Sequence, residues 1–100
     1  MITITAIIKA KSGSEVTMRD ALVTVAAHVA ANEPETIGFF ISQSEDDPRV
    51  FTTYERFADK AAMDRHNSSA VVATFFGIAK PVLDGEVILV TSREVSATLR

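Results

Sequence analysis

The sequence has 100 residues, of which 47% are hydrophobic, and its 13 acidic and 10 basic residues give a net charge of -3. This length predicts a single domain over residues 1–100, and the mixed charges argue against the basic patch of a nucleic-acid-binding protein and the basic amphipathic stretch of a membrane-surface protein. The absence of cysteine excludes disulfides, and the lack of a recognisable signal peptide at the start favours the cytoplasm.

The first part of the chain predicts a strand, a helix and a second strand. Isoleucine and threonine alternate over residues 2–9, which is the period of a strand. Ser12 and Glu15 fit a capping box at the start of a helix over residues 14–31. Its core face is a stripe of four apolar residues: Met18, Leu22, Val25 and Val29. A second strand is expected over residues 36–44.

The second part predicts a strand, a pair of short helices and a last strand. An acidic turn leads into a strand over residues 50–57, which is rich in β-branched and aromatic residues. Asp59 is a candidate N-cap for a helix over residues 59–66, and a second helix is expected over residues 69–79. The last strand is expected over residues 86–98.

This order predicts an α+β, ferredoxin-like βαββαβ fold, with a four-stranded antiparallel sheet and the helices on one face. The strands do not alternate cleanly between apolar and polar residues, since Ile7 adjoins Ile8 and Phe39 adjoins Phe40. Both faces of the sheet are therefore expected to be buried. Because the helices of one chain cover only one face, we expect a homodimer through the sheet faces, as in a dimeric α+β barrel.

The middle of the chain resembles a known family. It has Glu-Pro-Glu at residues 33–35, Tyr-Glu-Arg-Phe at 54–57 and Ala-Met-Asp-Arg-His-Asn-Ser-Ser at 62–69, followed by Phe75. These residues resemble the antibiotic biosynthesis monooxygenases of the dimeric α+β barrel superfamily, and the likeness covers residues 33–76. It implies the fold and the homodimer more firmly than any one activity.

The likeness also narrows the function. The superfamily includes cofactor-independent oxygenases of quinols and polyketides, haem-degrading enzymes and isomerases. The resemblance implies a quinol-monooxygenase-like oxidoreductase that uses no metal or organic cofactor and acts on a hydroxylated aromatic, quinol or polyketide between the sheet and the helices. The chain departs from the family where Phe57 replaces a frequent tryptophan and Val71 replaces a second histidine.

His66 is the candidate catalytic residue. A deprotonated, electron-rich aromatic passes an electron to dioxygen directly, so the protein must supply a dry pocket and a base that titrates near neutral pH. Histidine suits this role, and His66 shares a helix face with Ala62 and Met63, which should turn it toward the sheet. The alternative is a buried structural histidine whose ring is bonded to a backbone carbonyl.

Six further residues are candidates for contact with a small aromatic or quinol-like ligand: Phe39, Thr53, Glu55, Phe57, Phe75 and His28. Glu55 should lie on the opposite strand face from Tyr54, and its alternative role is an ion pair with Arg56, Arg65 or a partner chain. The alternative for His28 is a surface position near the end of its helix. The two histidines and scattered carboxylates form no recognisable metal-binding cluster, so no metal site is expected.

Two other functions remain open from the sequence. One is an isomerase of the same fold that moves a proton on a small carbonyl compound, with His28 and His66 as its acid–base pair. Such an enzyme would keep its rate without oxygen, whereas an oxygenase would stop. The other is a non-catalytic, ligand-binding dimer.

Overall fold

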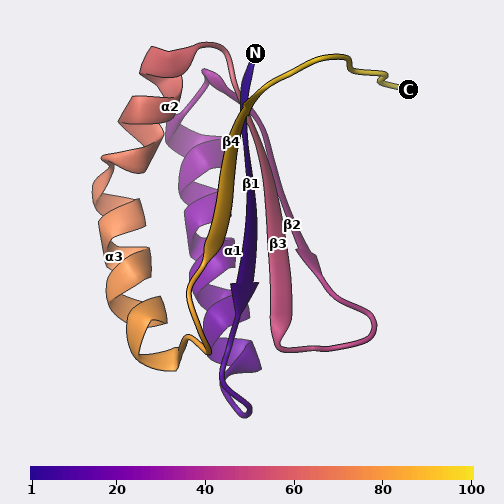
Figure 1. Cartoon of the computed structure of the whole chain (residues 1–100). Helices are drawn as coiled ribbons and strands as arrows, with labels where there is room; N and C mark the ends of the chain where they lie inside the picture. Colours follow the sequence, from indigo (N-terminus) through magenta and orange to yellow (C-terminus); the bar gives the residue numbers. More distant parts are fainter.

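The computed structural model describes all 100 residues and consists of one sheet with the helices on a single face (Figure 1). The elements are β1 (Ile2–Lys9), α1 (Glu15–Asn32), β2 (Thr36–Gln43), β3 (Val50–Phe57), α2 (Lys60–Asn67), α3 (Ala70–Ala79), the 3-10 turn η1 (Lys80–Val82) and β4 (Ile88–Arg93). This order confirms the predicted ferredoxin-like α+β fold, with α2 and α3 as the helical pair. None of the helices combines the length and apolar character needed to span a membrane.

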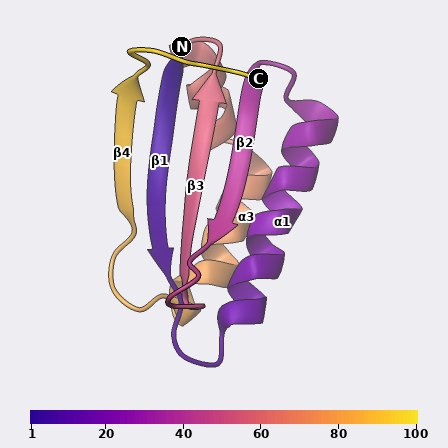
Figure 2. The same ribbon diagram turned by 90° about the vertical axis from the view of Figure 1, so that its right-hand side faces the viewer.

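The four strands are antiparallel and lie in the order β2-β3-β1-β4 (Figure 2). The register places Glu55 of β3 between Ile4 of β1 and Phe39 of β2. Since β3 is an inner strand, this carboxylate lies within the sheet and not at its edge. Its side chain points to the face that carries the helices, with Thr53 and Phe57, as the strand period predicts.

Two predicted boundaries are wrong for clear physical reasons. The N-cap of α1 is Ser14 and not Ser12, because Gly13 has a φ of +90° and continues the preceding turn. The Glu15 carboxylate instead accepts a hydrogen bond from the Gly13 N–H at 3.0 Å. The last strand ends at Arg93 because its neighbour β1 begins at Ile2, so the residues that follow have no β1 residue to pair with.

The junction of α2 and α3 is set by two side-chain caps. Asp59 accepts a hydrogen bond from the Ala62 N–H at 2.8 Å, which confirms it as the N-cap of α2. Ser69 is the N-cap of α3, and its hydroxyl donates to the carbonyl of His66 at 2.7 Å. These bonds fix the last turn of α2, where His66 lies.

The main core fills the space between the sheet and the helices α1 and α3. It contains the whole predicted stripe of α1, together with side chains of β1, β3 and α3: Ala6, Ile8, Ala10, Met18, Ala21, Leu22, Val25, Val29, Phe51, Phe75 and Ala79. A smaller cluster of Ile4, Phe57, Ala62 and Met63 packs α2 onto the sheet. The helices therefore rest on two adjacent clusters, and His66 projects from the helix that the smaller cluster holds.

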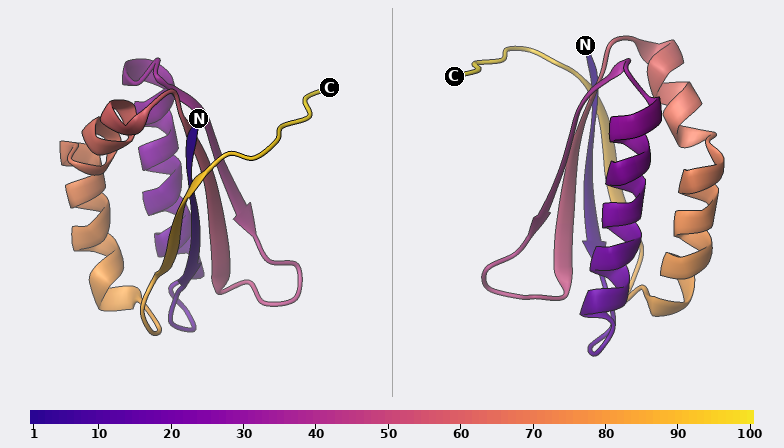
Figure 3. Two further views of the ribbon diagram at one scale, coloured as in Figure 1. Left: turned by 45° about the horizontal axis from the view of Figure 1, so that its top comes forward. Right: turned by 180° about the vertical axis from the view of Figure 1, so that it is seen from behind.

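The other face of the sheet carries no helix (Figure 3). Several large side chains on it are exposed: Ile7, Phe40, Tyr54, Ile88 and Val90. The C-terminal tail crosses only one end of this face (Figure 2). Arg56 holds the tail there, because its guanidinium donates to the Glu94 carboxylate at 2.9 Å and 3.0 Å.

The core predicts different costs for two phenylalanine truncations. Phe51 is 1% exposed and Phe76 is 46% exposed. Phe51→Ala should lower the free energy of unfolding by about 3–5 kcal/mol, since it leaves a cavity under α1. Phe76→Ala should lower it by about 1 kcal/mol or less. Urea unfolding followed by circular dichroism at one protein concentration measures both, and equal losses would contradict this assignment of the core.

Candidate functional site

His66 is buried between two carboxylates. Its side chain is 4% exposed, with Nδ1 2.8 Å from Glu33 Oε1 and Nε2 3.3 Å from Glu55 Oε1. The rings of Phe39 and Phe57 pack against the imidazole with centroid distances of 5.5 Å and 5.3 Å. The alternative of a ring bonded to a backbone carbonyl is therefore wrong.

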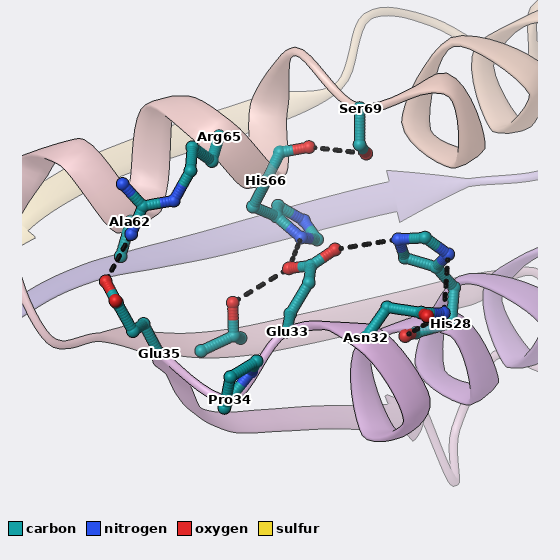
Figure 4. A pocket seen from close by; sticks show the side chains of 10 residues that line it. His28, Asn32, Glu33, Pro34, Glu35, Ala62, Arg65, His66 and Ser69 are labelled. Carbon is teal, nitrogen blue, oxygen red and sulfur yellow. Dashed lines mark hydrogen bonds and ion pairs between the residues drawn. The ribbon is translucent and has the colours of Figure 1, made fainter.

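Glu33 reaches His66 from the end of α1. It is the C-cap of that helix, and its N–H donates to the carbonyl of Val29 at 3.0 Å. The Thr36 hydroxyl donates to Oε1 at 2.8 Å, so this oxygen accepts from both Thr36 and His66. The other oxygen, Oε2, lies 3.3 Å from His28 Nε2 (Figure 4).

Glu55 approaches His66 from the sheet. The Thr53 hydroxyl donates to Glu55 Oε2 at 2.7 Å, while Oε1 faces the imidazole. The expected pairing of Glu55 with Arg56 or Arg65 is wrong. Arg56 lies on the opposite face with Glu94, and Arg65 pairs with Glu35 at the surface (Figure 4). The buried carboxylate is matched by a histidine of its own chain.

The two carboxylates decide the charge of His66. Burial lowers the pKa of His66, but hydrogen bonds to Glu55 and Glu33 and their negative charges outweigh it, and the pKa is raised above 6.5. Because the folded pKa is the higher one, protonation of His66 stabilises the fold. That contribution is complete below the unfolded pKa and is lost as the pH rises through the folded pKa.

An apolar pocket lies on one side of this charged group, between the sheet and α3. Eleven of its 15 lining residues are hydrophobic, among them Leu22, Phe39, Phe75, Phe76 and Leu89. Its polar lining consists of Thr53, Glu55, His66 and Asn67. The pocket can thus hold an apolar ring with a polar substituent directed at Glu55 and His66.

A polar cleft of about 320 Å³ lies on the other side, at the ends of α1 and α2 (Figure 4). Only one of its ten lining residues is hydrophobic, and they include His28, Asn32, Glu33, Arg65 and His66. His66 therefore lines both the apolar pocket and the polar cleft, whereas Glu55 lines only the pocket and Glu33 only the cleft.

Sequence comparison assigns the chain to a family. The family model described as antibiotic biosynthesis monooxygenase matches residues 1–77. The chain belongs to this family. No curated protein matches the sequence significantly.

Solved structures of the antibiotic biosynthesis monooxygenase family share the fold. A candidate member from Caulobacter crescentus is 20% identical, with a TM-score of 0.88 over 95% of this chain and 90% of that chain. One from Nitrosomonas europaea is 20% identical, with a TM-score of 0.87 over 96% and 100%. A conserved protein from Methanosarcina mazei Go1 is 19% identical, with a TM-score of 0.84 over 93% and 91%. At these identities the likeness shows the fold alone.

The structure brings together most of the residues that the sequence singled out in this family member. Phe39, Thr53, Glu55, Phe75 and His66 all line the apolar pocket. Two do not: Phe57 is fully buried, packed against the ring of His66, and His28 lines the polar cleft.

Sequence reasoning missed three residues around this family member's pocket and cleft. Phe76 and Asn67 line the pocket, and Glu33 holds His66. The signal for Glu33 was present, since it begins the Glu-Pro-Glu segment that resembles the family pattern. No cluster of three or more His, Cys, Asp or Glu side chains is arranged to hold a metal ion.

The electrostatics predict the titration of His66 in this monooxygenase-family protein. Glu33→Gln removes one of the charges that raise the pKa of His66, so that pKa should fall by about 1 unit or more. Asp64→Asn, on the exposed side of α2, should leave it nearly unchanged. Nuclear magnetic resonance of ¹⁵N-histidine-labelled protein measures this value cleanly, because the chain has only two histidines.

The wild-type protein provides the reference for this titration. A wild-type midpoint for His66 at or below 6.5, or a midpoint that Glu33→Gln does not move, would show that the carboxylates do not hold the imidazolium.

Proposed function

We propose that this protein is a homodimeric monooxygenase without cofactor, and that its substrate is a hydroxylated aromatic, quinol or phenolic polyketide. The observation that carries the proposal is a titratable pair, Glu55 and His66, buried at the polar end of an apolar pocket. Membership of the antibiotic biosynthesis monooxygenase family supports the same reaction class.

The Glu55–His66 pair removes the phenolic proton. Both ring nitrogens of His66 face carboxylates, so a hydroxyl in the pocket meets the Glu55 carboxylate, with the imidazole directly behind it. Glu55 takes the proton and His66 stores it as imidazolium, stabilised by Glu33. The unit must start without this extra proton, so kcat/KM should rise as the pH passes the raised pKa of His66.

The phenolate then reduces dioxygen without a metal. One electron passes from the phenolate to O₂, and the resulting phenoxyl radical and superoxide combine to form a C–O bond. The peroxide anion takes a proton from the Glu55–His66 unit. The O–O bond breaks as the C–H proton leaves, so one oxygen atom stays in the product as a carbonyl and the other leaves as water.

The pocket suits this sequence of steps. Its apolar lining keeps water from the radical pair, and the rings of Phe39 and Phe75 offer contact to a flat substrate. Asn67 is the only side-chain amide in the lining and supplies a donor for the developing peroxide anion.

Oxygen consumption with a panel of quinols, naphthols and anthrones tests this function. The wild type should consume one O₂ per product, and Glu55→Gln and His66→Gln should each lower kcat about 100-fold or more, since each removes the base. Glu45→Gln, in the exposed β2–β3 turn, is the matched control and should keep the wild-type rate. Turnover that persists without oxygen, or that survives both substitutions, would contradict the proposal.

The homodimer rests on the uncovered sheet face. Ile88 and Phe40 are each 57% exposed there, and burial of such a face against a second copy stabilises both chains.

Light scattering at micromolar concentration should report a dimer for the wild type. Ile88→Lys should shift it toward monomer, because the ammonium group would be buried in the interface. Val16→Lys is the control, since Val16 is 66% exposed on α1, away from the sheet. A monomeric wild type would contradict the dimer.

A further inference from the structure

Four titratable side chains run in a row from the apolar pocket to the polar cleft. Glu55 Oε1 lies 3.3 Å from His66 Nε2, and His66 Nδ1 lies 2.8 Å from Glu33 Oε1. Glu33 Oε2 lies 3.3 Å from His28 Nε2. Carboxylates and imidazoles alternate along the row, and each carboxylate or imidazole between the ends uses a different atom for each neighbour.

We propose that Glu55, His66, Glu33 and His28 form a proton relay that carries the substrate's proton from the apolar pocket to water in the polar cleft. Its use in turnover rests on the proposed oxygenase function, whereas the relay itself can be measured without any substrate.

Burial makes such a path necessary. The His66 side chain is 4% exposed and that of Glu55 is 9% exposed, so a proton taken up in the pocket has little direct access to water. Exposure increases along the row, to 14% for the Glu33 side chain and 33% for that of His28. The row therefore begins in a water-poor pocket and ends at a side chain that meets solvent.

The unused oxygen of Glu33 is the second observation. Oε2 is buried and accepts no hydrogen bond, and it is the only buried side-chain polar atom in that state. His28 Nε2 is close enough to bond to it, but its N–H is not aligned for a hydrogen bond. A buried acceptor without a donor is costly, so a rotation of the His28 ring that closes this bond is favourable. That rotation completes the row.

One proton moves at each step. Protonated Glu55 gives its proton to His66 Nε2, and His66 passes its Nδ1 proton to Glu33 Oε1. The Glu33 carboxyl group turns by half a revolution about its Cγ–Cδ bond and gives the proton to His28 Nε2. His28 releases the proton on Nδ1 to cleft water. Each group regains its starting charge, and the net change is one proton moved to solvent.

The neighbouring charges leave the relay free to act. Arg65 and Glu35 at the rim of the cleft pair with each other (Figure 4). Thr36 donates to Glu33 Oε1, and the Asn32 amide lies 3.3 Å from His28 Nδ1, so both are positioning residues that hold the carboxyl group and the ring.

Exchange of the His66 ring N–H protons with water tests the relay. It is measured by nuclear magnetic resonance on the ¹⁵N-histidine-labelled full chain, whose two histidines give separate signals. His28→Gln keeps a donor beside Glu33 but does not titrate in this range, so exchange should slow about tenfold or more. Glu33→Gln breaks the row at its centre and should slow exchange in the same way.

Two controls separate a relay from a structural role. Arg65→Gln alters the same cleft outside the row and should leave exchange within about twofold of the wild type. Free imidazole at millimolar concentration should restore fast exchange in His28→Gln, because it replaces the lost proton carrier, but not in Glu33→Gln. Backbone spectra verify that each variant is folded.

The outcomes are distinct. Signals that are broadened by exchange in the wild type and sharp in His28→Gln support the relay, as does a measured slowing. Equal exchange in the wild type and His28→Gln overturns it, whether the signals are sharp or broad in both. If exchange behaves as expected but no phenol or quinol is oxidised, the proposed oxygenase function fails and the relay stands.

Discussion

The placement of one buried imidazole between two carboxylates is the constraint on which the rest of this structure depends. Glu33 comes from the end of α1, Glu55 from an inner strand and His66 from the last turn of α2. Burying either carboxylate alone would be costly, because an unpaired charge loses its hydration. The imidazolium offsets that cost for both and fastens three elements at one point.

The same contact divides the space around it. On one side the rings of the apolar pocket exclude water, and on the other the ends of α1 and α2 leave a polar cleft. A group that lines both spaces can exchange protons between them, whereas a histidine within an apolar core cannot. The chemistry proposed for this protein follows from that boundary position more than from the presence of a histidine.

The inner strands β1 and β3 connect the pocket to the outer face of the sheet. Glu55 points to the helices, and its neighbours Tyr54 and Arg56 point to the other side. The helix-facing positions of β3 thus build the site, and the alternate positions present the face on which the proposed dimer depends. Changes to β3 are expected to affect both.

The fold was largely predictable from local patterns. The alternation over residues 2–9, the apolar stripe of α1 and the cap at Asp59 each act within a few residues, so the sequence displays them directly. The end of β4 was not predictable in this way, because it is set by where β1 begins.

The candidate site was predictable only in part. The strand period correctly placed Glu55 on the helix-facing side of β3, and helical spacing correctly turned His66 toward the sheet. The bond between Glu33 and His66 joins residues 33 positions apart, and no local pattern reports such a contact. Glu55 was expected to pair with arginine because charge alone suggests it, but the strand period turns Arg56 away and Arg65 lies on the surface.

Neutron diffraction of the deuterated protein at neutral pH would test the central claim most directly. It locates deuterium atoms, and the account predicts deuterium on both ring nitrogens of His66, with Nδ1 directed at Glu33 and Nε2 at Glu55. A bare Nε2, or a Glu55 side chain turned away from the ring, would show that the two carboxylates do not share one imidazolium and would contradict the account.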